Sequence, residues 1–113
     1  MHEWSLVQAL LERVAVEARA AGATAVHRIH VCIGEAAGVE PDLFARAFED
    51  FRVETVCARA ALEISRPPAR WECPRCGRSI ARGERLQCAG CLVPARLVQG
   101  DEILLQQVEL EVR

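Results

Sequence analysis

Four cysteines in two closely spaced pairs are the residues of this sequence best suited to chemistry. They follow the pattern C-x2-C, eleven residues, C-x2-C, and they are Cys73, Cys76, Cys88 and Cys91. A gap of two residues lets two sulfurs of one tight turn occupy neighbouring corners of a tetrahedron, the geometry that zinc prefers. A second pair completes the tetrahedron and leaves no position for a reactive water. We therefore expect a structural zinc ion.

Two disulfides, free thiols or a redox site are the other readings of these cysteines. The chain begins without the basic and apolar segments of a signal peptide, so we expect a cytoplasmic protein, in which disulfides are rare. A thiol oxidoreductase normally uses one C-x-x-C at the start of a helix, with no second pair nearby. Cys32 and Cys57 lack a partner at this spacing, and we interpret them as small buried side chains.

The N-terminus offers a second set of metal ligands. The Met1 amine, the backbone nitrogen of His2 and the His2 imidazole Nδ1 can close fused chelate rings, and Glu3 can supply a backbone nitrogen or a carboxylate. Such a square-planar set suits Ni(II) or Cu(II), which displace amide protons, whereas Zn(II) gains little from it. A histidine at position 2 is also common as a solvated terminal residue, so the pattern alone leaves both readings open.

Two helices are expected to position these groups. Apolar residues recur at helical spacing from Leu6 to Ala18, with Ser5 and Gln8 as a reciprocal cap at the start and Gly22 as the stop. A second helix begins at a proline, and its apolar stripe consists of Leu43, Phe44, Ala47, Phe48 and Phe51.

Three strands complete the expected fold. Residues 26–33 place Ile29, Val31 and Ile33 on one face, and residues 60–65 alternate in the same way before Pro67-Pro68. The last strand follows Gly100-Asp101, and its apolar alternation changes phase at Gln106-Gln107, which predicts a β-bulge.

These elements predict an α+β fold: a three-stranded sheet packed by two helices, with a small four-cysteine zinc-ribbon or knuckle insertion before the last strand. We assign residues 1–69 and 97–113 to a nickel-binding domain and residues 70–96 to a zinc-binding domain. No apolar run approaches the roughly 18 residues that span a bilayer, so we expect no membrane span.

The charge distribution bears on possible partners. The net charge is −2, and the overall acidity and the lack of interleaved aromatic residues argue against a nucleic-acid-binding zinc ribbon, which is the main alternative. Six arginines nevertheless lie between Arg70 and Arg96 against only Glu72 and Glu84, a formal +4. Four thiolates around a zinc ion would lower this to about +2, so the arginines partly compensate an anionic metal centre.

Several short segments, in this order, resemble one known family across essentially the whole chain. Besides the paired cysteines they are Met1-His2-Glu3, Ile33-Gly34, Gly38-Val39-Glu40-Pro41 and Gly100-Asp101-Glu102-Ile103. Together they resemble the HypA/HybF family of hydrogenase-maturation nickel metallochaperones.

This resemblance implies specific sites. It implies weak binding of Ni(II) at Met1, His2 and Glu3, with Glu40 as a further acidic group near the nickel, and zinc at the four paired cysteines. Some relatives carry histidines beside the zinc ligands. This chain has no histidine after His30, so we expect no histidine-based pH switch at its zinc centre.

The resemblance also implies partners and a class of function. The partners are a nickel-binding maturation GTPase, the large subunit of [NiFe] hydrogenase and, in some organisms, urease accessory proteins. The protein itself is expected not to be an enzyme, and its sequence shows neither a nucleophile–base pair nor a phosphate-binding loop.

Overall fold

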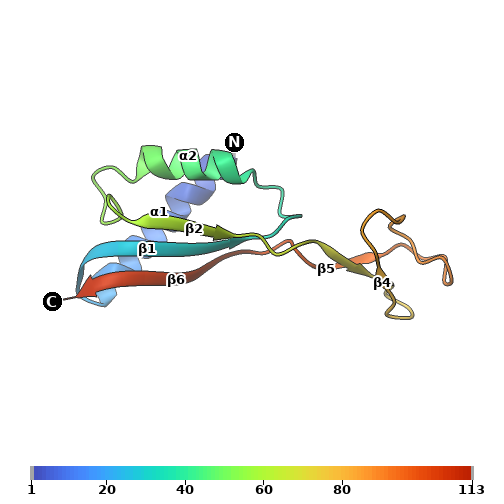
Figure 1. Cartoon of the computed structure of the whole chain (residues 1–113). Coiled ribbons are helices and arrows are strands. Elements are labelled where there is room, and N and C mark those ends of the chain that lie inside the picture. Colours follow the sequence, from blue (N-terminus) through green and yellow to red (C-terminus); the bar gives the residue numbers. More distant parts are fainter. Residues whose placement is uncertain (1, 113) are drawn as a thin grey trace.

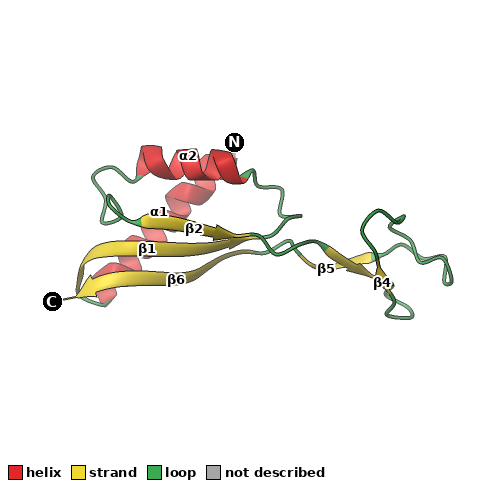
Figure 2. Ribbon diagram, viewed as in Figure 1, coloured by secondary structure: helices red, strands yellow, loops and turns green. Residues whose placement is uncertain are grey.

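Two three-stranded sheets lie at opposite ends of an elongated molecule that measures 59 × 26 × 17 Å (Figure 1). The computed structural model describes residues 2–112. The main sheet has the order β2-β1-β6 and contains β1 (Ala23–Ile33), β2 (Ala61–Ser65) and β6 (Ile103–Val112). Helices α1 (His2–Ala20) and α2 (Pro41–Phe51) pack on one face of it (Figure 2). The predicted α+β class is confirmed.

The strand pairing follows from the connections. Parallel strands β1 and β2 are joined through α2, because parallel neighbours need a crossover, whereas β6 pairs antiparallel with the other edge of β1. Opposite β6, His30 pairs with Gln107 but Val31 pairs with Leu105, so Gln106 is an extra residue on β6. The β-bulge expected at Gln106-Gln107 is confirmed.

The core lies between the helices and the main sheet. From α1 it receives every third or fourth residue, which gives Val7, Leu11, Val14 and Ala18. From α2 it receives Phe44, Ala47 and Phe48. Leu43 departs from the expected stripe of α2, because its position turns it outward and leaves it 43% exposed.

Helix α1 begins at His2 and not at Ser5, so the predicted cap at Ser5 is wrong. Ser5 is an exposed residue within the first turns of the helix. Tertiary contacts replace the local cap. The Glu3 side chain is buried and accepts the backbone N–H of Glu40 at 3.1 Å, and Trp4 packs edge-on against Phe51 with ring centroids 5.0 Å apart. With these contacts, α1 begins three residues before Ser5, where the local capping pattern predicted its start.

The cysteine unit, residues 70–99, forms the second sheet. It contains β3 (Arg70–Glu72), β4 (Ser79–Ile80) and β5 (Arg96–Gln99) in the order β4-β3-β5. The four paired cysteines lie in the turns of this unit, before β6, as expected. Within the described residues, neither helix combines the length and apolar character needed to cross a membrane.

Two glycines meet where the chain passes between the sheets. A Cβ built on Gly34 would lie 2.1 Å from the carbonyl oxygen of Gly100, so the backbones touch at a distance that no side chain permits. Gly100 has a φ of +108° and is itself in close contact with Ala69. Gly34 therefore allows the segment at Gly100 to lie against the end of β1, and Gly100 in turn allows the segment at Ala69 to lie against it.

We expect Gly34→Ala to destabilise the protein by about 3 kcal/mol, because backbone must move to admit the methyl group. Chemical denaturation monitored by circular dichroism measures this difference. Gly90→Ala is the matched control, since a Cβ at Gly90 meets no atom within 4 Å. Equal stability of the two variants would contradict this interpretation of the junction.

Candidate metal centres

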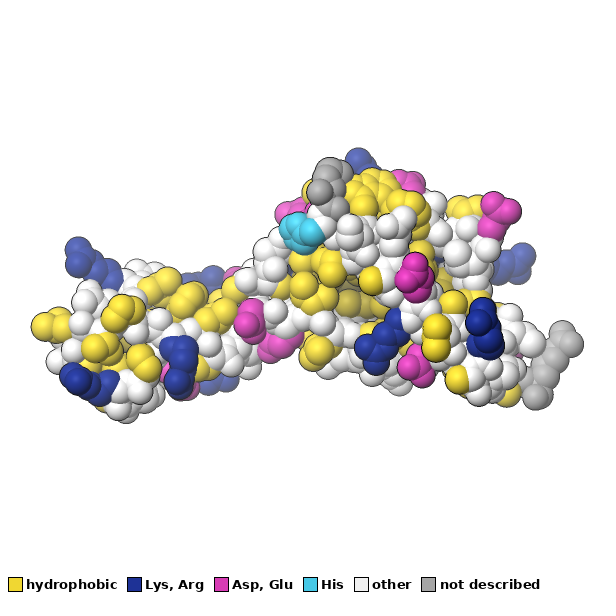
Figure 3. Space-filling model, turned by 180° about the vertical axis from the view of Figure 1, so that it is seen from behind, with side chains coloured by type: hydrophobic (Ala, Val, Ile, Leu, Met, Phe, Trp, Pro, Cys, Tyr) yellow, Lys and Arg dark blue, Asp and Glu magenta, His cyan; other side chains and the backbone are white. Residues whose placement is uncertain are grey.

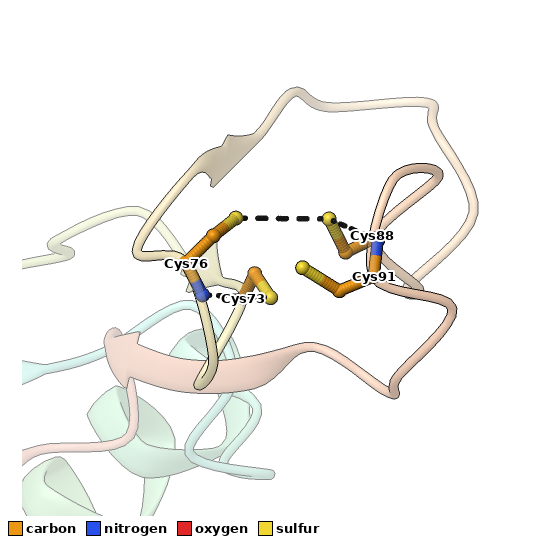
Figure 4. A group of neighbouring side chains, drawn as sticks. All are labelled: Cys73, Cys76, Cys88 and Cys91. Atoms are coloured by element: carbon orange, nitrogen blue, oxygen red, sulfur yellow. Dashed lines mark hydrogen bonds between the residues drawn. The ribbon is translucent and has the colours of Figure 1, made fainter.

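The four paired cysteines converge on one point. Their sulfur atoms all lie within 4.8 Å of one another, although the two pairs are separated by a linker in the sequence (Figure 4). The sulfurs of Cys76 and Cys88 are 3.8 Å apart. A zinc–sulfur bond of about 2.3 Å gives a tetrahedron whose edge is about 3.8 Å, which matches the Cys76–Cys88 separation, and the other sulfurs are near enough to share one ion. All six cysteines of the chain are free.

Each pair is held in a turn with the same hydrogen bonds. In the first turn, the N–H of Cys73 donates to the carbonyl of Arg78 at 2.9 Å, and the N–H of Gly77 returns to the carbonyl of Cys73 at 2.9 Å. Backbone N–H groups of Arg75 and Cys76 point at the Cys73 sulfur, at 3.3 and 3.4 Å. Such N–H donors favour a thiolate, which is the form that binds a metal.

The second turn repeats this geometry with a different residue at its bend. The N–H of Cys88 donates to Val93 at 3.0 Å, the N–H of Leu92 donates to Cys88 at 2.8 Å, and the N–H of Cys91 points at the Cys88 sulfur at 3.4 Å. Leu92 thus corresponds to Gly77, and both have a positive φ, +58° and +79°. A leucine in this conformation is strained, and its side chain is 71% exposed.

We expect Leu92→Gly to relieve this strain and to tighten metal binding by the cysteine unit roughly two- to fivefold, because folding of the unit and metal binding are coupled. Competition with a chelator of known zinc affinity measures the change. Gly77→Ala is the opposite test at the equivalent position and should weaken the binding. The interpretation is wrong if both substitutions change the affinity in the same direction.

The thiols favour a bound cation. The backbone N–H of Cys91 and the guanidinium of Arg78 lower the pKa of Cys88 to about 6, and backbone N–H donors also lower the pKa of Cys73. Burial and the neighbouring thiols raise the pKa of Cys91 to about 12. Four thiolates this close repel one another unless a cation lies between them, so a divalent ion stabilises the fully deprotonated set. The donor set therefore fits a soft-ligand metal such as zinc.

The cysteine turns do not resemble a redox site. Neither pair lies in or at the start of α1 or α2, the two helices of the described residues, so no helix terminus activates a thiol. Cys32 and Cys57 are buried, 5% and 0% exposed, and lie outside the sulfur cluster. The interpretation of these two residues as small buried side chains is confirmed.

The other candidate centre lies at the start of α1. Met1 is outside the described residues, so its amine is not placed. The His2 side chain is largely exposed, and its Nε2 lies 2.7 Å from the carbonyl oxygen of Gly38. A carbonyl only accepts hydrogen bonds, so the proton of the neutral imidazole lies on Nε2 and the lone pair on Nδ1. Nδ1 is the nitrogen that the N-terminal chelate requires.

The two acidic residues of this region have different roles in the structure. Glu3 accepts the N–H of Glu40, and this bond is the main cause that lowers the pKa of the Glu3 carboxyl. The Glu40 carboxylate faces its own helix, where it accepts the N–H of Asp42 at 3.4 Å as the N-cap of α2. His2, Glu3 and Glu40 therefore come together from α1 and from the loop before α2.

The backbone amide nitrogens in the first turn of α1 are also suitable metal ligands. Because α1 begins at His2, the N–H groups of His2 and Glu3 lie among the first four of the helix, which have no partner within the helix. A metal that displaces these amide protons breaks no helical hydrogen bond. The sequence pattern identified the ligands but not the carbonyl of Gly38, since a backbone acceptor has no signature in residue type.

Comparisons with known proteins agree on one family. The model of the family described as hydrogenase/urease nickel incorporation, metallochaperone, HypA, matches residues 1–110. The hydrogenase maturation factors HypA of Wolinella succinogenes and Shewanella halifaxensis are 40% and 37% identical. Each matches 98% of this chain, and the match covers 96% and 98% of their own lengths.

Solved structures give the same result. The solution structure of the nickel metallochaperone HypA from Helicobacter pylori is similar with a TM-score of 0.72 and 30% identity, over 98% of each chain. A second solution structure of a HypA protein gives a TM-score of 0.77 and 31% identity, over 100% of this chain and 98% of the other. The structural similarity thus extends over both sheets of the molecule.

Proposed function

The chain belongs to the HypA family of nickel-incorporation metallochaperones, and on this basis we propose that it binds Ni(II) at its N-terminus and delivers it to [NiFe] hydrogenase during maturation. The ligands are the Met1 amine, the backbone nitrogens of His2 and Glu3 and the His2 imidazole, with the Glu3 carboxylate and Glu40 close by. The observation that carries this proposal is the bond from His2 Nε2–H to the Gly38 carbonyl, which leaves Nδ1 free for the metal.

The geometry suits a carrier because the nickel is accessible from outside. His2 is exposed and lies at a chain end, so a partner can approach the ion and replace the ligands one at a time. An ion that is held by a terminal chelate, and not enclosed by the fold, can be released without unfolding the protein. No catalytic role is proposed for the chain, and energy for transfer is assigned to the partner GTPase.

We propose zinc as the resident ion of the four paired cysteines. The support is the sulfur spacing, the donor type and the equivalent turns described above. The ion would be held by Cys73, Cys76, Cys88 and Cys91, and it would supply the cross-link that orders the cysteine unit. In this division, residues 1–69 and 97–113 carry nickel and residues 70–96 carry zinc, and the second boundary falls within β5 of the cysteine unit.

The proposed partners are a nickel-binding maturation GTPase and the hydrogenase large subunit, with urease accessory proteins as further clients, all in the cytoplasm. The different net charges of the cysteine unit and of the rest of the chain support docking of partners at both. Arginine side chains project from the cysteine unit, whereas the rest of the chain is acidic overall (Figure 3). A partner can thus distinguish the two ends electrostatically.

A transfer experiment tests the proposal. The untagged chain is loaded with radiolabelled nickel and mixed with the hydrogenase large-subunit precursor and the maturation GTPase in the presence of a competing chelator. We expect label to enter the precursor faster from the loaded chain than from the same amount of free nickel. If the chelator removes the label equally in both cases, the carrier function is refuted.

A further inference from the structure

One loop of the main domain contacts both parts of the molecule. This loop, residues 34–40, connects β1 to α2. On the nickel side, the Gly38 carbonyl accepts His2 Nε2 at 2.7 Å, and the Glu40 N–H donates to Glu3 at 3.1 Å. The loop therefore sets the position of two nickel-site side chains directly, through backbone groups.

Glu35 attaches the same loop to the cysteine unit. Arg82, in the turn that follows β4, places Nη2 at 2.7 and 3.0 Å from the two carboxylate oxygens of Glu35. One of these oxygens also accepts the N–H of Ala69 at 2.7 Å, just before β3. Glu35 is thus bonded to two separate points near and within the cysteine unit, and it lies only three positions before Gly38.

The backbone of the loop contacts both chain segments that connect the sheets. The N–H of Glu35 donates to Pro67 at 2.9 Å, in the segment that enters the cysteine unit. The N–H of Ala36 donates to Gly100 at 2.6 Å, in the segment that leaves it. A rotation of the cysteine unit about these segments would strain the loop, because its hydrogen bonds reach both of them.

The ion pair between Glu35 and Arg82 joins an ionised carboxylate to one particular arginine. The Arg82 side chain and the Ala69 N–H lower the pKa of the Glu35 carboxyl, so this group is ionised at neutral pH. Within residues 2–112, the other arginines of the unit form no side-chain hydrogen bond or ion pair with the main domain. Arg78 pairs with Glu84 inside the unit, and among the described residues Arg85 makes no ion pair. The contact between Glu35 and Arg82 is therefore specific to one arginine of the six.

We propose that Glu35 is a positioning residue for the nickel site: by holding Arg82 and Ala69 it fixes the loop whose Gly38 carbonyl orients the His2 imidazole. Nickel affinity then depends on how the cysteine unit is docked. Coupling of this kind is reciprocal, so nickel binding strengthens the docking by the same factor. The inference rests on the proposed nickel site, and its test separates the two.

The test uses the full untagged chain and two single variants, Arg82→Gln and Glu35→Gln. For Arg82→Gln we expect Ni(II) binding to weaken roughly two- to fivefold, the range of an exposed ion pair, since both side chains are partly solvated. Glu35→Gln should weaken it by up to about tenfold, because the charged acceptor of the Ala69 N–H is also lost. Calorimetric titration with Ni(II) measures both affinities.

Two further readouts separate positioning from general stability. Hydrogen exchange at the Ala69 amide should be faster in both variants. The ring-nitrogen chemical shifts of His2 should indicate a smaller population of the tautomer that has its proton on Nε2. Arg85→Gln is the matched control, an exposed arginine of the same turn region, and should leave all three quantities unchanged. The double variant Glu35→Arg and Arg82→Glu, in which the two charges are exchanged, should recover part of the nickel affinity that the single variants lose.

The outcomes separate the two proposals. If the unaltered chain binds no nickel, the proposed function and this inference both fail. If it binds nickel but Arg82→Gln and Glu35→Gln match the Arg85→Gln control, the carrier function stands and the positioning role of Glu35 is overturned. If the variants weaken nickel binding and the exchanged pair recovers it, the positioning role is supported.

Discussion

Replacement of Cys73 by serine is expected to abolish zinc binding and to unfold residues 70–99 while the main sheet and its helices stay folded. The cysteine unit has little core of its own, since its buried apolar residues are Ile80 and two of the proposed zinc ligands, Cys73 and Cys88. Small units of this kind draw about 10–16 kcal/mol of apparent stability from the metal, which greatly exceeds the burial of one isoleucine. The main domain has a separate core, so we expect its folding not to depend on the ion.

Metal analysis and a two-dimensional amide NMR spectrum measure this effect. The signals of Trp71 and Leu97, which pair across β3 and β5, should lose their dispersion, whereas those of the main-sheet core should keep theirs. Cys32→Ser is the matched control, because Cys32 is also a buried cysteine but lies outside the cluster. It should retain zinc. A Cys73→Ser protein with a fully dispersed spectrum would show that the ion is not structural.

Much of the fold could be predicted because its signals are local. The helical spacing of apolar residues in α1 and α2, and the change of phase at Gln106, each come from neighbouring residues that must face one core. The cysteine cluster could be predicted for a similar reason, since two C-x2-C turns have few uses other than a shared metal. The four sulfurs converge as that spacing requires.

Long-range contacts set the limit of the sequence-based predictions. The start of α1 depends on a bond between Glu3 and the N–H of Glu40, 37 positions apart, which overrides the cap that Ser5 and Gln8 suggest locally. The pairing of Glu35 with Arg82 spans 47 positions. Neither Glu35 nor Arg82 lies in a sequence pattern that indicates this contact, because the contact forms only when the main domain and the cysteine unit pack together.

The proposed nickel site depends on both local sequence and long-range contacts. The residues Met1, His2 and Glu3 supply a possible chelate, but many chain ends offer similar groups by chance. The structure adds the loop that orients the imidazole and a helix start that leaves the amides free. These contacts preorganise the His2 imidazole for the proposed chelate, at a position where the sequence alone left two interpretations open.

His2→Ala is accordingly expected to weaken Ni(II) binding of the untagged chain by more than about a hundredfold. Loss of a supporting contact around a metal ligand already costs about 10–100-fold in affinity, and this substitution removes the ligand itself, so the chelate ring through Nδ1 cannot close. Acetylation of the N-terminal amine should have a similar effect by removing the other end of the chelate. Calorimetric titration with Ni(II) at neutral pH measures both.

The zinc content and the fold are the internal controls for the effect of His2→Ala on nickel binding. His2 is exposed, and its side chain contacts the Gly38 carbonyl and the neighbouring Glu3 carboxylate, so His2→Ala should leave the zinc content and the far-ultraviolet circular dichroism unchanged. His27→Ala is the matched control, since His27 is equally exposed and pairs with Glu111 on the strand surface. It should bind nickel like the unaltered chain. Nickel affinity that survives both His2→Ala and acetylation would place the ion elsewhere, because the backbone amides of His2 and Glu3 cannot complete the chelate without the terminal amine and the imidazole.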